Sequence, residues 1–379
     1  MTSKENYKYR RIIVKAGTNI LTGGSDELDE VFIENLVSQI SDLSKVGREM
    51  ILVSSGAVAA GRGAMKSLGK SSALPDRQVL AAVGQGRLMH LYEEAFAIHG
   101  IPTAQALLSR RDVNDRLGYL NLRNTLLSLL VNGVVPVINE NDVVAVEELE
   151  GEVFGDNDTL SALVANLIDA DLLVILGSVE GMYTKDPNIH KDAQLISVVE
   201  KIDDKVNQYA GPSSDIRGRG GMVTKIQAAQ LATASGVDVV IANGMKDSVI
   251  SRLSKGEKIG TLFKTSVSKL ESRKRWMLSG LSNKSHIKID QGAVSALKAS
   301  KTSLLPAGVL GCMGKFERGD IVYIRDENEN NIAAGISNYG SPDLRKIQGL
   351  NSDLIEKILG HHYGDEVIHR DNMVMLLND

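Results

Sequence analysis

The chain has 379 residues, a net charge of −4 and one cysteine, Cys312. This length exceeds one ordinary hydrophobic core and predicts two domains, and the negative charge argues against a dominant nucleic-acid-binding surface. A single cysteine excludes a disulfide framework within the chain and fits a reducing cytoplasm. No apolar run approaches the roughly 20 residues of a membrane span, and the segment at 1–11 lacks the apolar core of a secretory signal. These properties predict a cytoplasmic globular protein.

Apolar runs typical of buried strands alternate with segments of helical periodicity over the first two-thirds of the chain. The predicted strands are residues 11–14, 50–53, 102–107, 134–138, 171–176 and 237–242. The predicted helices are residues 29–45, 77–99, 120–131, 159–168 and 224–234. This alternation favours an α/β domain, residues 1–270, with a mostly parallel sheet covered by helices on both faces.

The pattern changes after about residue 270. Residues 271–275 are mostly charged, and we interpret 271–284 as a solvated linker. The segments HIKIDQGAV, GVLGCMGKF, GDIVYIRD and NIAAGISNY then indicate short strands separated by turns. The sequence therefore predicts a small β-rich domain at 285–370.

Two clusters of carboxylates and amides lie between Val134 and Ala162. The strand at 134–138 delivers residues 139–142 (Asn-Glu-Asn-Asp) at its carboxyl end, and residues 156–158 (Asp-Asn-Asp) open the helix expected to begin near Thr159. Ligands of open α/β sheets bind at this edge. Such residues also form turns and N-caps. Their carboxylates would repel each other without a partner, so we expect a bound ammonium group, a metal or a lysine beside them.

Three other segments indicate phosphate binding, although no GxxxxGK[ST] motif is present. Lys15 ends the first strand and is followed by glycine, which places a positive charge beside exposed backbone N–H groups. Ser55 and Gly56 open a helix of small residues, where hydroxyl and N–H groups form an anion site. The simpler alternatives are a solvated lysine and a serine N-cap.

The third segment is the glycine-rich loop GRGGMVTK, which opens a helix with Lys225 in its first turns. A lysine near a helix N-terminus is unfavourable with the helix macrodipole. Because local conflicts of this kind occur at functional sites, we expect a bound anion there.

Six motifs, VKAGTN, SSGAVAAGR, VPVINEND, GDNDTLSA, EGMYTKDP and GGMVTK, occur in this order. Together they closely resemble the glutamate 5-kinases of the amino acid kinase family, over nearly the whole chain. EGMYTKDP is shared with aspartate and uridylate kinases, whereas INEND followed by GDND is more specific to the glutamate enzymes. SLLPAGV, GDIVYI and IAAGISNY resemble the PUA domain that many bacterial members carry.

The resemblance implies an αβα sandwich with a PUA-like tail, and phosphorylation of the side-chain carboxylate of L-glutamate by ATP and Mg2+ to L-glutamyl 5-phosphate in proline biosynthesis. It also implies a homo-oligomer inhibited by proline, and leaves the metal ligands open. By the same resemblance, Lys15 and Lys225 stabilise the transferring phosphoryl group and Asp158 orients both lysines. The residues implied to hold glutamate are Ser55, Gly56, Asn139, Asp142, Asp156 and Asn157. Those implied to hold ATP are Lys15, Gly177, Ser178, Arg219, Gly220, Gly221, Met222, Val223, Thr224 and Lys225.

The chain departs from the family pattern at two positions on the nucleotide side. Gly177-Ser178 stands where the family usually has Thr-Asp, and Arg219 where its glycine loop usually has Thr.

Two alternative functions also stay open. One is a sibling kinase acting on aspartate, acetylglutamate or a nucleoside monophosphate, against which the INEND and GDND pair argues. The other is an RNA-binding protein, although the tail mixes Lys and Arg with Asp and Glu and shows no strongly basic face.

Overall fold

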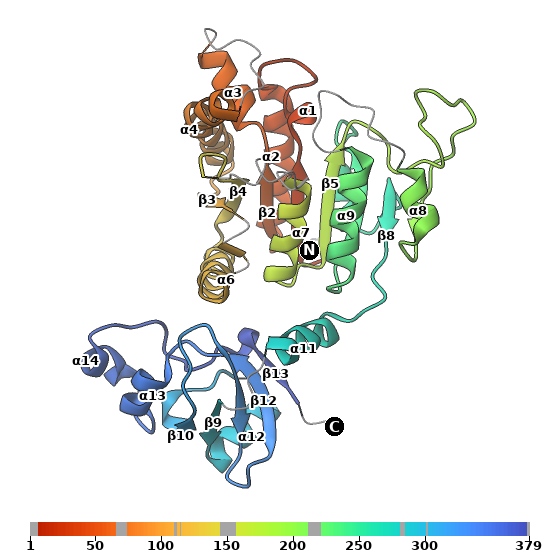
Figure 1. The fold of residues 1–379 in the computed structure, drawn as a ribbon. Helices are drawn as coiled ribbons and strands as arrows, with labels where there is room; N and C mark the ends of the chain where they lie inside the picture. The colour runs from red at the N-terminus through yellow and green to blue at the C-terminus, as the bar shows by residue number, and fades with distance from the viewer. Residues whose placement is uncertain are drawn as a thin grey trace, which may run out of the picture. The chain divides into compact units, whose positions relative to one another are not determined.

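The computed structural model describes residues 7–65, 74–109, 112–113, 115–144, 157–210, 221–280, 285–300 and 302–376. The chain divides into two compact units (Figure 1). Unit 1 comprises Met1–Val113 and Arg123–Ser268, and unit 2 comprises Asn114–Leu122 and Lys269–Asp379. This division differs from the predicted domains in placing Asn114–Leu122 with the second unit.

The centre of unit 1 is a sheet with the strand order β3-β4-β2-β1-β5-β7-β8-β6. Its strands are β1 Arg11–Ala16, β2 Glu49–Ser54, β3 Thr103–Leu108, β4 Val135–Glu140, β5 Leu172–Gly177, β6 Val198–Val199, β7 Asp238–Asn243 and β8 Thr261–Phe263. All neighbours pair parallel except β7 and β8. The six predicted strands and the mostly parallel sheet are confirmed. The sequence missed β6 and β8 because two or three residues are too short to show periodicity.

The helices that pack around this sheet confirm the predicted β/α alternation. They are α1 Thr18–Leu21, α2 Glu30–Lys45, α3 Ala57–Ala64, α4 Leu74–Ile98, α6 Arg116–Val131, α7 Asn157–Leu167, α8 Asp204–Tyr209, α9 Met222–Thr233 and α10 Val249–Ser254. Helices α2, α4 and α10 share one apolar cluster with the strands. Helices α7 and α9 pack against each other and against β1, β5 and β7 on the other face (Figure 1).

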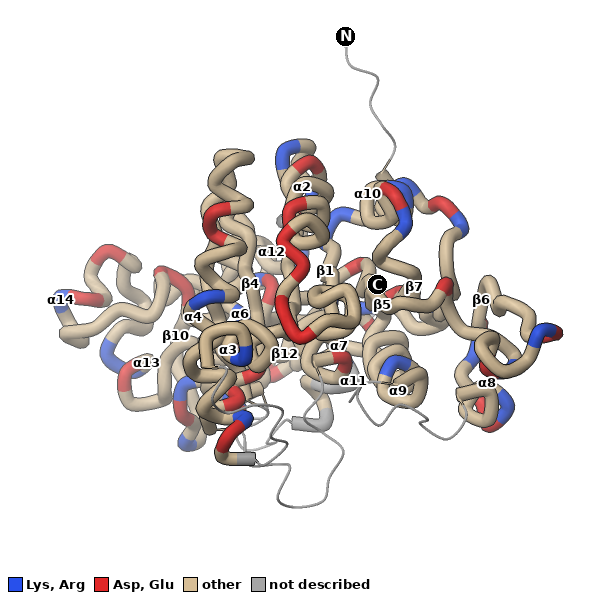
Figure 2. Tube along the Cα trace, turned by 90° about the horizontal axis from the view of Figure 1, so that it is seen from above, with Lys and Arg blue, Asp and Glu red and all other residues tan. Residues whose placement is uncertain are grey.

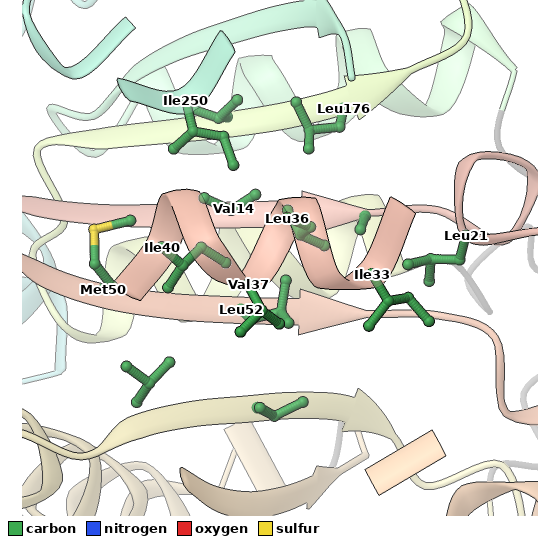
Figure 3. Close-up of a cluster of buried hydrophobic side chains, with 14 of the residues drawn as sticks. Val14, Leu21, Ile33, Leu36, Val37, Ile40, Met50, Leu52, Leu176 and Ile250 are labelled. Atoms are coloured by element: carbon green, nitrogen blue, oxygen red, sulfur yellow. The ribbon is translucent and has the colours of Figure 1, made fainter. Parts of the chain in front are cut away.

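The main core of unit 1 follows the alternation of side chains along β1. Ile12, Val14 and Ala16 belong to one cluster with the apolar face of α2, which begins after the N-cap Asp29. Figure 3 shows side chains of α2 directed at the strands beside Val14. Because successive side chains of a strand point to opposite faces, Lys15 lies on the opposite face, where α7 packs.

Unit 2 contains a second sheet with the strand order β10-β9-β11-β12-β13. Its strands are β9 His286–Ile289, β10 Val309–Met313, β11 Ile321–Arg325, β12 Asn331–Ile336 and β13 Met373–Met375. Its helices are α11 Lys269–Gly280, α12 Gln291–Ser300, α13 Ser341–Ile347 and α14 Ile355–Leu359, with 3₁₀ turns η3 Pro306–Gly308, η4 Ser352–Leu354 and η5 Arg370–Asn372. The predicted β-rich domain is confirmed, but QGAV starts α12 instead of extending β9.

The stretch that we interpreted as a solvated linker is largely helical, because α11 spans Lys269–Gly280. Met277 on this helix is fully buried in an apolar cluster with Ile321, Ile336 and Leu120. Leu120 lies in the first turns of α6, which belong to unit 2. The charged composition of 271–275 therefore belongs to a helix that buries Met277, which a composition-based interpretation does not detect.

Candidate active site

The predicted substrate and phosphate residues meet at one edge of the sheet of unit 1. Strands β4, β2, β1 and β5 are neighbours and parallel, so their carboxyl ends lie together. Asn139, Lys15 and Gly177 are in the last two positions of β4, β1 and β5, and Ser55 follows β2. Helices α7 and α9 begin at the same edge, because Asp158 in the first turn of α7 contacts both Lys15 of β1 and Lys225 of α9. This confirms that the two polar clusters converge, for the residues that the structure describes.

The centre of the site is the carboxylate of Asp158, which two lysines share. Nζ of Lys15 lies 2.6 Å from Oδ1 of Asp158, and Nζ of Lys225 lies 3.0 Å from Oδ2. The hydroxyl of Thr224 donates a hydrogen bond of 2.9 Å to the same Oδ2. Asp158 is fully buried and Lys15 is 3% exposed. The lysine predicted to be either solvated or phosphate-binding is therefore removed from water and held in one position.

The charges of this group explain why it is stable inside the protein. Burial alone would raise the pKa of Asp158, but the adjacent ammonium groups of Lys15 and Lys225 outweigh it and hold that pKa well below its usual range. Asp158 also lies in the first turn of α7, where the helix macrodipole favours a carboxylate. The aspartate is therefore ionised at neutral pH and holds both lysines in place.

The geometry decides between the alternatives for two predicted residues. Asp158 is not an N-cap, because α7 begins one residue earlier, at Asn157. Lys225, in the first turns of α9, opposes the macrodipole of its own helix, and its contact with Asp158 compensates for this. The unfavourable position of Lys225 near the N-terminus of its helix is thus explained by its ion pair with Asp158 at the sheet edge.

A chain of side-chain amides forms the second part of the site. Nδ2 of Asn157 donates to Oγ of Ser55 at 2.9 Å and to Oδ1 of Asn139 at 3.1 Å. Nδ2 of Asn139 donates in turn to Oε1 of Gln85 on α4 at 2.8 Å. Oδ1 of Asn157 is buried and accepts no hydrogen bond among the residues that the structure describes. A buried acceptor of this kind suits a ligand that brings an N–H donor.

Gln85 is the residue of this chain of amides that the sequence did not indicate. It lies within the predicted helix 77–99 and outside every motif. No local pattern distinguishes it from a surface glutamine, because only the packing of α4 on the sheet brings it to Asn139.

Glycines make the close packing around Ser55 possible. Gly56 has a φ of +103°, and a Cβ there would lie 3.2 Å from Leu28, so the turn after β2 requires glycine. Gly56 is the N-cap of α3, without a side-chain capping bond, so Ser55 is not an N-cap and its hydroxyl is used by Asn157. Helix α3 crosses α4 at Gly61 and Gly84, where a Cβ on Gly84 would lie 1.8 Å from the carbonyl oxygen of Ala57.

The other predicted residues lie around this centre or outside the described part of the chain. A Cβ on Gly177 would lie 3.7 Å from Cε of Lys225, and Ser178 follows it. Gly221 is the N-cap of α9, and Met222 and Val223 are half-buried in its first turn. Asp142 is half-buried in the turn after β4. Asp156, Arg219 and Gly220 lie outside the described residues.

No group of three or more His, Cys, Asp or Glu side chains among the described residues is arranged to hold a metal ion. No helix in that part of the chain is long and apolar enough to cross a membrane.

Comparisons with known proteins show which family this chain belongs to. The sequence profile of the amino acid kinase family matches residues 10–243, and that of the PUA domain matches residues 285–359. The glutamate 5-kinase of Dehalococcoides mccartyi (strain ATCC BAA-2266 / KCTC 15142 / 195) is 50% identical over 368 residues, covering 97% of this chain and 99% of the relative. That of Caldanaerobacter subterraneus subsp. tengcongensis is 48% identical over 366 residues, covering 97% of this chain and 98% of the relative.

Proposed function

Because this chain belongs to the amino acid kinase family, and within it to the glutamate 5-kinases, we propose that it transfers the terminal phosphoryl group of ATP to the side-chain carboxylate of L-glutamate. The products are L-glutamyl 5-phosphate and ADP, and the reaction is a step of proline biosynthesis. The observation that carries this proposal is the pair of lysines held on one buried carboxylate at the sheet edge.

The chemistry requires positioning and charge stabilisation. The side-chain carboxylate of glutamate has an ordinary pKa of about 4.3 and is ionised near neutral pH, so no general base is needed. A carboxylate oxygen forms a bond to the terminal phosphorus as the bond from that phosphorus to the bridging oxygen breaks, and ADP leaves with the electron pair. Lys15 and Lys225 stabilise the negative charge on the transferring group, and Asp158 orients both.

The hydrogen-bonded side-chain amides of Asn157, Asn139 and Gln85, called the amide chain from here on, lie on the glutamate side of the site. We assign the recognition of glutamate to Ser55, Asn139 and Asn157, with Gly56 shaping the turn and Asp142 beside them; Asp156 is included on the resemblance alone. The hydrogen bonds that join Ser55, Asn157 and Asn139 support this assignment. Asn157 then presents its Oδ1 to the ammonium group of the amino acid.

The nucleotide side lies along β5 and the N-terminus of α9. We assign it to Gly177, Ser178 and Gly221–Lys225, and on the resemblance alone to Arg219 and Gly220. A helix N-terminus favours phosphate, and Gly177 lies beside Lys225, since a Cβ there would lie 3.7 Å from its Cε.

We propose that Mg2+ enters the site with the phosphates of ATP. Mg2+ is usually held by one or two carboxylates together with substrate phosphates. Asp158 is already paired with two lysines, and the described residues hold no preformed metal cluster. When bound, Mg2+ neutralises charge on the phosphates.

Three further properties are proposals from family membership. They are location in the cytoplasm, assembly into a homo-oligomer, and inhibition by proline at a site overlapping that of glutamate.

RNA binding by the PUA domain has little electrostatic support, because residues 285–370 carry 10 Lys and Arg against 11 Asp and Glu. Figure 2 shows both signs interspersed along the described parts of the chain.

The test of the reaction is an ATP-dependent hydroxamate assay that traps acyl phosphates. The substrates are glutamate, aspartate, acetylglutamate and uridylate, with reactions lacking ATP or Mg2+ as controls. We expect turnover of glutamate that needs both. Faster turnover of aspartate than of glutamate would contradict the assignment.

A further inference from the structure

We propose that Gln85 is a positioning residue for substrate recognition, because it accepts the hydrogen bond of Asn139 and so holds in place the amide chain that presents Oδ1 of Asn157 to the ammonium group of the substrate. This inference rests on the proposed function, in that it assumes an amino acid in the site. It assigns a role to a residue of α4 that lies outside every motif of the sequence.

The direction of the amide chain is determined at Asn139. The backbone N–H of Glu140 donates to Oδ1 of Asn139 at 2.8 Å. A backbone N–H is only ever a donor, so this contact requires the carbonyl oxygen of the Asn139 amide on that side. The NH2 group of Asn139 must then point the other way, toward Gln85, whose Oε1 accepts its hydrogen bond at 2.8 Å.

The orientation of Asn139 determines that of Asn157. Oδ1 of Asn139 also accepts from Nδ2 of Asn157 at 3.1 Å, so the Asn157 amide must present its NH2 group to Asn139 and Ser55. Its Oδ1 is left as a buried acceptor without a hydrogen-bond partner among the described residues. The opposite orientation of the chain would present an NH2 group, which repels an ammonium group.

Gln85 is well placed to hold this arrangement because the packing of α4 fixes its position. The preceding residue, Gly84, lies in backbone contact with α3 at Ala57. Two turns later, the hydroxyl of Tyr92 bonds the hydroxyl of Ser54 at 2.7 Å, at the end of β2. Residues seven apart lie on the same face of a helix, so one face of α4 is attached to the ends of both β2 and β4.

The experiment compares three variants of the full-length enzyme. Gln85→Met keeps the length of the side chain and removes the acceptor, whereas Gln85→Glu keeps an acceptor for Asn139. The matched control is Gln39→Met, because Gln39 is a buried glutamine of unit 1 that also accepts a hydrogen bond, from the backbone N–H of Ile250 at 3.0 Å, far from the sheet edge. Thermal melting is measured for all three.

We expect Gln85→Met to raise the KM for glutamate about 10- to 100-fold, in keeping with loss of a hydrogen bond to a charged group, without changing the KM for ATP. Gln85→Glu should stay within about threefold of the parent, since its acceptor is retained. Gln39→Met should lower the melting temperature and leave both KM values unchanged.

The specific readout is the comparison of glutamate with glutarate, which lacks the ammonium group. Inhibition by glutarate should be nearly the same for the parent and Gln85→Met, so that only binding of the amino acid weakens. Equal weakening of both ligands, an unchanged KM in Gln85→Met, or the same KM rise in Gln85→Glu, overturns the role of Gln85. Absence of glutamate turnover in the parent enzyme instead overturns the proposed function, so the two failures are distinguishable.

Discussion

The ammonium group of Lys225 lies 3.0 Å from the carboxylate of Asp158, although the two residues are 67 positions apart in the chain. Lys15, from the first strand, contacts the other oxygen of the same carboxylate. Three distant segments are thus joined at one fully buried group. A pair of lysines in fixed positions can stabilise charge on a transferring phosphoryl group without reorganising during the reaction.

Replacement of Lys225 tests the catalytic role of this group. Removing a donor aimed at transition-state charge typically costs about 2.7–4 kcal/mol, or roughly 10²–10³ in kcat. We therefore expect Lys225→Ala to lower kcat at least a hundredfold, with a smaller effect on the KM for glutamate. Lys264→Ala is the control, because Lys264 is 55% exposed beside Glu200. A near-normal kcat in Lys225→Ala would leave that residue a structural lysine.

The carboxylate of Asp158 predicts a pH-dependent contribution to stability. Asp158→Asn leaves the buried ammonium group of Lys15 and the half-buried one of Lys225 without their shared counter-charge, and breaking such a pair costs about 3–5 kcal/mol near neutral pH. Because the folded-state pKa of Asp158 is depressed, its contribution is fully present above the unfolded pKa of about 3.9. The contribution falls as pH drops from there toward the folded pKa.

The measurement is the melting temperature of the parent and Asp158→Asn between about pH 3 and pH 7. The difference between them should be constant above about pH 5 and shrink at lower pH. A difference that grows on acidification would have the wrong sign for an ionised, lysine-paired aspartate.

Two glycines of α4 offer a matched test of the helix crossing that supports Gln85. A Cβ on Gly84 would lie 1.8 Å from the carbonyl oxygen of Ala57, whereas a Cβ on Gly86 would meet nothing within 4 Å. Gly84→Ala should destabilise the protein by about 1–3 kcal/mol through overpacking and raise the KM for glutamate. Gly86→Ala should stabilise it by about 0.5–1 kcal/mol. Denaturant unfolding compares the two, and equal effects would contradict the close crossing.

Proline and glutamate share an ammonium group and an α-carboxylate, so overlapping sites predict competition. Raising glutamate should relieve inhibition by proline, and Asp142→Ala should weaken both ligands because Asp142 lies in the turn three residues after Asn139. Initial rates over a grid of the two concentrations measure this. Inhibition that does not depend on glutamate would instead indicate a separate proline site.

The kinase unit should fold and turn over glutamate without residues 269–379, once an apolar side chain of Asn114–Leu122 that their removal exposes has been replaced. In a chain ending at Ser268, the side chain of Leu120 no longer has its packing partners Met277, Ile321 and Ile336 and becomes exposed. Exposed apolar patches promote association. We expect that chain to aggregate, and its Leu120→Gln variant to be monodisperse in gel filtration with the KM of the full-length enzyme. Loss of turnover in the monodisperse variant would mean that unit 2 helps to build the active site.

Much of unit 1 could be predicted from local patterns. Its six longer strands are continuous apolar runs, and a buried parallel strand requires such a run. The edge position of Lys15, Asn139 and Asn157 followed from the rule that parallel strands end together. What the patterns could not decide was whether Asp158 caps a helix or binds lysines, because the same residue type serves both purposes.

The sequence by itself determined the α/β alternation, the order of the motifs and the edge of the sheet where the chemistry lies. Only the tertiary structure decided that Asp158 is shared by Lys15 and Lys225, that Asn139 donates a hydrogen bond to Gln85, and that the charged stretch after Lys269 is a helix with Met277 buried. The reason is physical. Periodicity and turn chemistry report interactions between residues close in the chain, whereas these contacts form only after helices pack on the sheet and bring distant side chains within hydrogen-bond distance.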